Sequence, residues 1–246
     1  MTQQFECILA GHSPSVYLFG SAVLDDFRLG WSDIDILCFA QKPLIDAQAN
    51  KLLELRQAML GQWPQNPYFR SFEGIITGWD VVASASKATV VYWGTSGQRI
   101  MDSFTIDAFS MIGLLRHGQL RCGIDHRKRL SMPSRVELYL AIAEHLATIR
   151  KYAKQTDGRV YSAGWLFDIA RCLYTLRTGD IMAKTKAGLW ALEQGLAPEP
   201  EILRRAIQVR EQPLRCQDNT TRDWLASLGP SVQRFADVLE GALHRA

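Results

Sequence analysis

The stretch that decides the fold is Leu18-Phe19-Gly20-Ser21, followed after eleven residues by Asp33-Ile34-Asp35. Val16 to Phe19 is a short apolar run and Asp33 to Phe39 is a second, so both segments are predicted to be strands. Glycine at the end of the first strand permits a tight turn into a predicted short helix over Ala22 to Phe27. This order of strand, turn, helix and strand predicts the start of a domain that mixes both kinds of structure.

Asp33 and Asp35 are two carboxylates on one predicted strand. Side chains alternate faces along a strand, so both point the same way while Ile34 packs on the other face. Adjacent carboxylates repel each other, and a divalent cation removes that conflict. Hard oxygen ligands beside substrate phosphates suit Mg²⁺. At the preceding turn, Gly20 allows close backbone approach, and the amides and hydroxyl around Ser21 can hold phosphate oxygens.

The rest of the first half alternates helix and strand signals. Leu44 to Leu60 has the apolar spacing of an amphipathic helix. Phe72 to Thr77 and Val81 to Trp93 are rich in branched and aromatic residues and are predicted to be strands. From about Asp102 the apolar residues return to helical spacing.

Beyond residue 130 the sequence shows no convincing strand. We expect an α+β fold, with a mixed sheet flanked by helices over residues 1–120 and an all-α helical bundle over 131–246. The polar, basic stretch Gly118 to Ser131, which includes His126 to Arg129, is predicted to be a solvated linker. The helices of the bundle are predicted over Pro133 to Lys154, Gly158 to Leu176, Glu199 to Glu211 and Thr221 to His244.

Composition excludes several classes of protein. The 246 residues are 47% hydrophobic and 22% charged, as in globular proteins, and the net charge of +3 does not favour a nucleic-acid partner. The five cysteines include no CxxC pair, which indicates free thiols. The polar start, Met1 to Gln4, lacks the pattern of a signal peptide, and no apolar run is long enough to span a membrane. We therefore expect a cytoplasmic protein.

The turn and the Asp33-Ile34-Asp35 motif together resemble the signature of the DNA polymerase β-type nucleotidyltransferase superfamily. More narrowly, the chain resembles the aminoglycoside adenylyltransferases that inactivate streptomycin and spectinomycin. The similarity extends over about residues 15 to 210. Further stretches that carry it are Arg70-Ser71-Phe72-Glu73-Gly74-Ile75-Ile76, Arg171-Cys172-Leu173-Tyr174, Thr178-Gly179-Asp180-Ile181, Lys184 and Trp190-Ala191-Leu192-Glu193.

This resemblance implies roles for the residues of the first domain. Asp33 and Asp35 would bind Mg²⁺, while Ser21, after Gly20, would contact the triphosphate. Glu73 would be the general base and a further metal ligand, because a carboxylate can accept the proton of an attacking hydroxyl. The alternative for Glu73 is a surface position on an edge strand, in which case Asp80 is the next candidate for the third carboxylate.

In the second domain, the resemblance implies that Arg171 and Lys184 contact the phosphates of ATP, since charge-assisted contacts neutralise the leaving pyrophosphate. The alternative is ordinary ion pairing on a helix surface. Asp168 lies three residues before Arg171, on the same helix face, and is expected to be the partner of a nearby cation.

For the acceptor, the resemblance implies contacts from Tyr152 and Asp157. Two positions depart from the streptomycin-modifying pattern: Tyr161 replaces an expected aspartate, and Ser96 replaces an expected tryptophan. The implied activity is Mg²⁺-dependent transfer of AMP from ATP to a hydroxyl of an aminoglycoside or aminocyclitol-like molecule. The departures favour spectinomycin or an unrelated hydroxyl compound over streptomycin.

Two other classes of function remain open from the sequence. One is an adenylyltransferase of the toxin-antitoxin type, which modifies a protein or a tRNA. The other is a non-catalytic nucleotide-binding module with a regulatory role. The fused helical half and the modest net charge disfavour the first. The combination of Asp33, Asp35 and Glu73 disfavours the second, since a binding module needs no metal cluster with a base.

Overall fold

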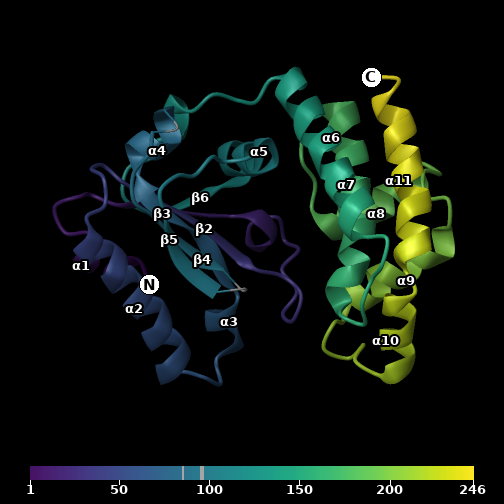
Figure 1. Cartoon of the computed structure of the whole chain (residues 1–246), viewed down its shortest axis with the longest axis horizontal. Helices are drawn as coiled ribbons and strands as arrows, with labels where there is room; N and C mark the ends of the chain where they lie inside the picture. Colours follow the sequence, from purple (N-terminus) through teal and green to yellow (C-terminus); the bar gives the residue numbers. More distant parts are fainter. Residues whose placement is uncertain (85, 95–96) are drawn as a thin grey trace. The chain divides into compact units, whose positions relative to one another are not determined.

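The computed structural model describes residues 1–84, 86–94 and 97–246. The chain forms two compact units (Figure 1). The sheet unit comprises Met1–Phe27 and Ser32–Met132, and the helical unit comprises Arg28–Trp31 and Pro133–Ala246. The α+β fold expected from the sequence is confirmed.

The sheet has six strands in the order β5-β4-β3-β2-β1-β6, and only β2 and β3 run parallel to each other. The strands are β1 Ser15–Phe19, β2 Ile34–Ala40, β3 Phe72–Gly78, β4 Val90–Gly94, β5 Gly97–Met101 and β6 Gln119–Cys122. The helical segments of this unit are α1 Thr2–Ile8, η1 Gly20–Ala22, α2 Asp46–Gln62, α3 Pro67–Arg70, α4 Trp79–Ser84, α5 Ala108–His117 and η2 Arg127–Arg129.

Each face of this sheet carries its own hydrophobic core. Ile36 and Cys38 of β2 pack on one face with Leu52 of α2, while Leu37 and Phe39 pack on the other face. Figure 1 shows α1 and α2 on one side of the sheet, and α4 and α5 belong to the other side. Because β2 is buried on both faces beyond Asp35, its residues from Ile36 to Ala40 form a continuous apolar run and do not alternate with polar ones.

Two local predictions for this unit were wrong. The segment Val81 to Trp93, predicted as strand, begins inside helix α4, and strand β4 starts only at Val90. Trp79 and Val81 are buried in the core on the α4 face, so tertiary packing overrides the strand preference of the branched residues. The helix predicted over Ala22 to Phe27 is also absent. The 3-10 turn η1, over Gly20–Ala22, reaches only the first residue of that segment.

The helical unit is a bundle, as predicted. Its elements are α6 Arg135–Tyr152, η3 Val160–Ala163, α7 Gly164–Thr178, α8 Lys184–Glu193, α9 Pro200–Glu211, α10 Asn219–Ala226 and α11 Gly229–Leu243. Helix α6 begins with a capping box, in which Ser134 and Glu137 each bind the backbone amide of the other. The long helix predicted over Thr221 to His244 is divided into α10 and α11, with Pro230 in the first turn of α11.

A short segment from the first part of the sequence belongs to the helical unit. Trp31 is 4% exposed, and its ring meets Phe167 of α7 edge-on at 6.0 Å between centroids. The guanidinium carbon of the buried Arg210 lies 5.2 Å from the centroid of the Trp31 ring. The residues just before Ser32 and Asp33 are therefore fixed by the core of the helical unit.

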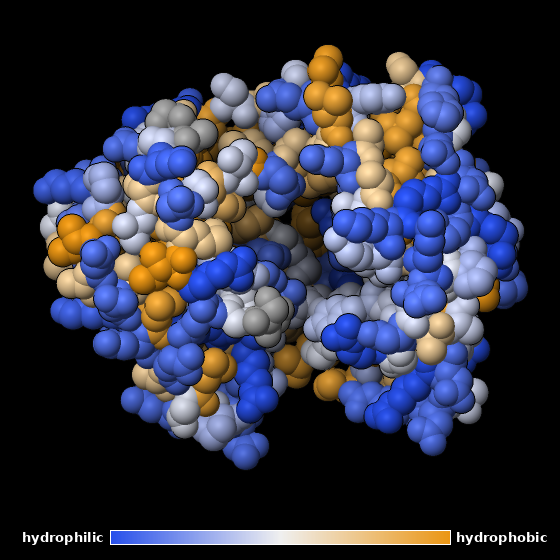
Figure 2. All heavy atoms as spheres, in the orientation of Figure 1, coloured by the Kyte–Doolittle hydropathy of each residue, from blue (hydrophilic) through white to orange (hydrophobic). Residues whose placement is uncertain are grey.

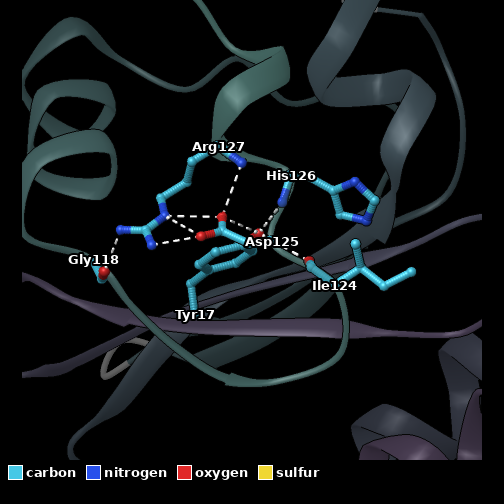
Figure 3. Close-up of polar contacts among 6 residues, drawn as sticks. All are labelled: Tyr17, Gly118, Ile124, Asp125, His126 and Arg127. Carbon is cyan, nitrogen blue, oxygen red and sulfur yellow. Dashed lines mark hydrogen bonds and ion pairs between the residues drawn. The ribbon is translucent and has the colours of Figure 1, made fainter.

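The stretch predicted as a solvated linker is instead structured. Strand β6 pairs with β1, and the following residues gather around the buried Tyr17 (Figure 3). The Tyr17 hydroxyl accepts a hydrogen bond from the His126 amide at 2.6 Å and donates to the Ile124 carbonyl at 3.2 Å. Arg127 pairs with Asp125 at 2.6 Å and holds the pKa of that carboxyl well below its ordinary value. The prediction was wrong because it assumed that the basic side chains face solvent, whereas Arg127 pairs with the neighbouring Asp125.

The ring of Trp79 covers two further residues of this stretch, His126 and Arg129. His126 is 6% exposed, and its ring packs against the ring of Trp79 with 4.8 Å between centroids and a tilt of 34°. The guanidinium carbon of Arg129 lies 4.6 Å from the Trp79 ring centroid. Burial lowers the pKa of His126, and the charge of Arg129 lowers it further. We refer to Tyr17, Asp125, His126 and Arg127 as the Tyr17 cluster, which fastens the end of the sheet unit to β1.

Hydrophilic side chains cover most of the visible face in Figure 2. Among residues 1–84, 86–94 and 97–246, no helix combines the length and the apolar character needed to cross a bilayer.

We predict that Tyr17→Phe lowers the free energy of unfolding of the sheet unit by about 1–3 kcal/mol, because the His126 amide and the Ile124 carbonyl lose a buried partner. Hydrogen exchange of the β6 amides, followed by NMR or mass spectrometry, measures this opening directly. Tyr68→Phe, which alters a 49% exposed side chain, is the control. Equal protection of β6 in both variants would show that the cluster carries no stability.

Candidate active site

The parallel pairing of β2 with β3 places Asp35 directly beside Glu73. Registered residues on neighbouring strands point to the same face of a sheet, so the two carboxylates share one face near the start of both strands. Asp33 lies one residue before β2, and the following amide, that of Ile34, donates to the Ser71 carbonyl at 2.7 Å. The structure therefore brings together two predicted site residues, Asp35 and Glu73, which lie far apart in the sequence.

Gly20 lies against this pair. Its φ of +68° is in the left-handed region, and a Cβ added there would stand 1.9 Å from Oδ2 of Asp35. Phe19, the residue before it, pairs with Asp35 across β1 and β2. Glycine is needed at position 20 both for the backbone conformation and for the close approach of the carboxylate.

Ser21, in the turn after β1, is hydrogen-bonded to the segment that carries the two aspartates. Its hydroxyl donates to the backbone carbonyl of Asp33 at 3.2 Å. In this structure the hydroxyl therefore ties the turn to the residue before β2. Its contact with a triphosphate remains a prediction.

Glu73 has a partner that the sequence did not reveal. The hydroxyl of Tyr92, on β4, donates to Oε1 of Glu73 at 2.6 Å. Asp80, the other candidate for the third carboxylate, is exposed in the first turn of α4, beyond the opposite end of β3. Glu73 is therefore the carboxylate that stands beside Asp35.

The residues of this site fit a magnesium ion bound together with a substrate. In the described ranges, no group of three or more histidine, cysteine, aspartate or glutamate side chains is arranged to hold a metal ion. Mg²⁺ in nucleotide enzymes commonly takes one or two carboxylates, with phosphates and water as its other ligands. Asp33 and Asp35 supply the hard oxygens that this requires. The role of Glu73 as a third metal ligand stays a prediction.

In the helical unit, cations gather around one carboxylate. Lys184 at the start of α8 lies 3.0 Å from Asp168 of α7, and His145 of α6 lies 4.0 Å from it. Burial raises the pKa of Asp168, but the charges of Lys184, Arg171 and His145 outweigh this effect and hold the pKa below its ordinary value. Asp168 is therefore an ionised counter-ion, as expected from the sequence.

Arg171 adds a donor to this cation cluster, which we define as His145, Asp168, Arg171 and Lys184. The Nε of Arg171 is buried and has no hydrogen-bond partner in the part of the chain that the structure describes. With Asp168 ionised, Arg171 and Lys184 leave the cluster with an excess of positive charge even when His145 is neutral. Such a cluster can bind an anion with several negative charges, such as a chain of phosphates.

The two residues predicted to contact the acceptor both lie in the helical unit. Tyr152 ends α6, is 60% exposed and carries the Lys151 ammonium 4.9 Å from its ring centroid. Asp157 binds the side chain of Arg159 at 2.7 Å. Burial raises the pKa of Asp157, but hydrogen bonds from Arg159 and Ser162 lower it more, so the carboxylate is ionised. A cationic acceptor bound at the predicted position would have to share this carboxylate with Arg159.

The two departures from the streptomycin-modifying pattern have different outcomes. Tyr161, in η3, lies 6.3 Å from Trp31 between ring centroids and is 52% exposed. It therefore supplies an aromatic face where the pattern expects a carboxylate. Ser96 lies outside the described residues.

Parts of the chain match models of known protein families. A sequence model of the nucleotidyltransferase domain matches residues 9–75, and a model of the aminoglycoside adenylyltransferase C-terminal domain matches residues 132–239. Among solved structures, the chain is similar to the spectinomycin adenyltransferase AAD(9) from Enterococcus faecialis, crystallised with ATP and spectinomycin. The TM-score is 0.65 at 14% identity, over 97% of this chain and 98% of that one. No protein with a curated description matches significantly.

The fold and the matched N-terminal domain place the chain among the nucleotidyltransferases. The match of its C-terminal half makes the classification narrower: the chain belongs to the aminoglycoside adenylyltransferase family. The family resemblance inferred from the sequence is thereby confirmed.

We predict that Gly20→Ala destabilises the sheet unit by about 1–3 kcal/mol more than Gly11→Ala, because only the first substitution drives a methyl group into Asp35. Both glycines have positive φ, and a Cβ at Gly11 meets no atom within 4 Å. Gly11→Ala therefore isolates the cost of the backbone conformation. Urea unfolding of both variants makes the comparison, and equal losses of stability would contradict the close approach.

Proposed function

We propose that this protein transfers AMP from ATP to a hydroxyl of an aminoglycoside or aminocyclitol-like small molecule, with Mg²⁺, and releases pyrophosphate. The observation that carries the proposal is the register that sets Asp35 beside Glu73, next to the Gly20-Ser21 turn. A metal-binding carboxylate and a base on one sheet face are what nucleotidyl transfer to a hydroxyl requires.

The reaction is an in-line displacement. The acceptor oxygen attacks the α-phosphorus of ATP, and its proton passes to Glu73. The bond between the α-phosphorus and the bridging oxygen breaks as the new ester forms, and pyrophosphate leaves with the electrons of that bond. Asp33 and Asp35 would hold Mg²⁺, which supplies positive charge against the phosphates.

The cation cluster supports ATP as the donor. Arg171 and Lys184 carry the positive charge that a triphosphate and a departing pyrophosphate need. Asp168 keeps Lys184 in place, and the buried Nε of Arg171 still has a hydrogen bond to give. We propose that both cations bind phosphate oxygens of the nucleotide.

Spectinomycin is the acceptor that we favour. The structurally similar AAD(9) was crystallised with spectinomycin, whereas two positions here depart from the streptomycin-modifying pattern. Tyr152 is exposed and can cover an apolar face of a ring compound. Asp157, already paired with Arg159, suits an acceptor with few positive charges better than one with many.

We predict that the protein releases pyrophosphate from Mg-ATP when spectinomycin is added, and that Asp33→Asn and Asp35→Asn each reduce the rate by at least about 100-fold. Pyrophosphate detection against a panel of aminoglycosides and aminocyclitols, with mass spectrometry of the adenylylated product, checks this. Asp46→Asn, an exposed aspartate at the start of α2, is the matched control. Full activity of both site variants would refute the mechanism, and stimulation only by a protein or tRNA would refute the acceptor class.

We predict that Lys184→Met weakens ATP binding about tenfold, because a charge-assisted contact to phosphate is worth more than about 1 kcal/mol. Calorimetry with a non-hydrolysable ATP analogue and Mg²⁺ measures the affinity. Lys186→Met removes an exposed lysine two residues along α8 and should leave the affinity unchanged. Equal affinities of the two variants would exclude Lys184 from the phosphate site.

A further inference from the structure

Tyr92 is bound to the proposed base by a short hydrogen bond. Its hydroxyl donates to Oε1 of Glu73 at 2.6 Å, near the short end of the range for O–H···O contacts. The two residues come from neighbouring antiparallel strands, with Tyr92 opposite Ile75 in the register. Both are part of the sheet framework, so the contact does not depend on a loop.

Gly94 makes room for this tyrosine. Residues two apart on a strand face the same side, so the side chain of residue 94 would stand next to that of Tyr92. A Cβ at Gly94 would lie 2.1 Å from the Tyr92 hydroxyl oxygen and 2.3 Å from Cζ. The backbone at Gly94 is not in the left-handed region, so glycine serves here to leave space for the phenol.

Arg99 holds the other side of the ring. It pairs with Tyr92 across β4 and β5, and its guanidinium carbon lies 4.3 Å from the ring centroid. A cation over a tyrosine ring is attracted to the ring face and restricts the ring's movement. Tyr92 is thus fixed by Gly94 and Arg99 while its hydroxyl holds Glu73.

We propose that Tyr92 is a positioning residue for Glu73 in the transfer reaction, an inference that rests on the proposed function. The hydrogen bond occupies Oε1 and leaves Oε2 to accept the proton of the acceptor hydroxyl. Fixing a glutamate side chain in one conformation costs conformational entropy. Because Tyr92 already fixes Glu73 in the absence of substrate, this loss does not add to the free energy of activation. Catalysis depends on such placement, since small errors in position lower the rate strongly.

The test is a double-mutant cycle of Tyr92→Phe and Glu73→Gln on the transfer reaction. We expect Tyr92→Phe to lower kcat about tenfold, with KM for ATP changed by less than about twofold. In the Glu73→Gln background, the same substitution should change kcat by less than about twofold, because the residue through which Tyr92 acts is already lost. An equal loss in both backgrounds, or no loss in the first, would overturn the proposal.

A second variant guards against a general effect on folding. Gly94→Ala keeps the phenol but pushes against its hydroxyl, and we expect it to lower kcat in the same direction as Tyr92→Phe. Tyr68→Phe, in which another phenol of the sheet unit is removed, is the control and should keep its activity. Wild-type kcat in Gly94→Ala would also count against the proposal.

A spectroscopic measurement separates this inference from the proposed function. In protein labelled with ¹³C at glutamate Cδ, the Glu73 signal is the one that Glu73→Gln removes. We expect Tyr92→Phe to shift this signal while the other glutamate signals keep their positions. If the wild type transfers AMP to no acceptor but the signal shifts, the proposed function fails, while the placement of Glu73 by Tyr92 stands. An unshifted signal rejects the role of Tyr92 whatever the activity.

Discussion

The candidate site depends on the parallel pairing of β2 with β3. The other strand pairs of the sheet are antiparallel, whereas β2 and β3 run parallel, and a parallel pair needs a crossover connection. Helix α2 lies in that crossover and packs Leu52 and Met59 into the core. A shift of one residue in the register would turn Glu73 to the opposite face from Asp35. The apolar residues of β2 and β3 that pack on the two faces of the sheet hold this register. They therefore also hold the two carboxylates side by side.

The two units present groups of opposite charge. The sheet unit presents acidic groups, Asp33, Asp35 and Glu73, and the helical unit presents a cluster in which cations exceed anions. In the proposed reaction the carboxylates would hold the metal ion, and the cations would bind phosphates of the nucleotide. Asp168 shows how the positive charges can be kept together before a substrate arrives, since one ionised carboxylate partly offsets their mutual repulsion.

The sequence was sufficient for the parts of the fold that follow from local pattern. The turn at Gly20, the strand that begins beside Asp33 and the strand that bears Glu73 were all predicted from apolar runs and a glycine. Predictions failed where distant residues decide the structure. The branched residues of α4 suit a strand equally well, and only the core against which Val81 packs makes them helical.

Other features of the site had no signal in the sequence. Nothing local to Tyr92 indicates that its hydroxyl reaches Glu73, because the contact depends on how β3 and β4 align. In the same way, the basic residues after β6 were predicted to be a linker because no residue near them in the sequence indicates a contact with the sheet. The residue that holds them there, Tyr17, lies far away in the sequence. Long-range register, which no local pattern encodes, explains both.

The position of Trp31 has a consequence for the evolution and engineering of this chain. The polypeptide enters the helical unit at Arg28, leaves it after Trp31 and returns to it at Pro133, so the boundary in space is crossed more than once. A cut between residues 132 and 133 therefore does not separate two independent modules. It would strip Trp31 of Phe167 and Arg210 and expose a large aromatic ring immediately before the acidic motif. Recombination between relatives should succeed only when residues 28–31 are exchanged together with the helical half.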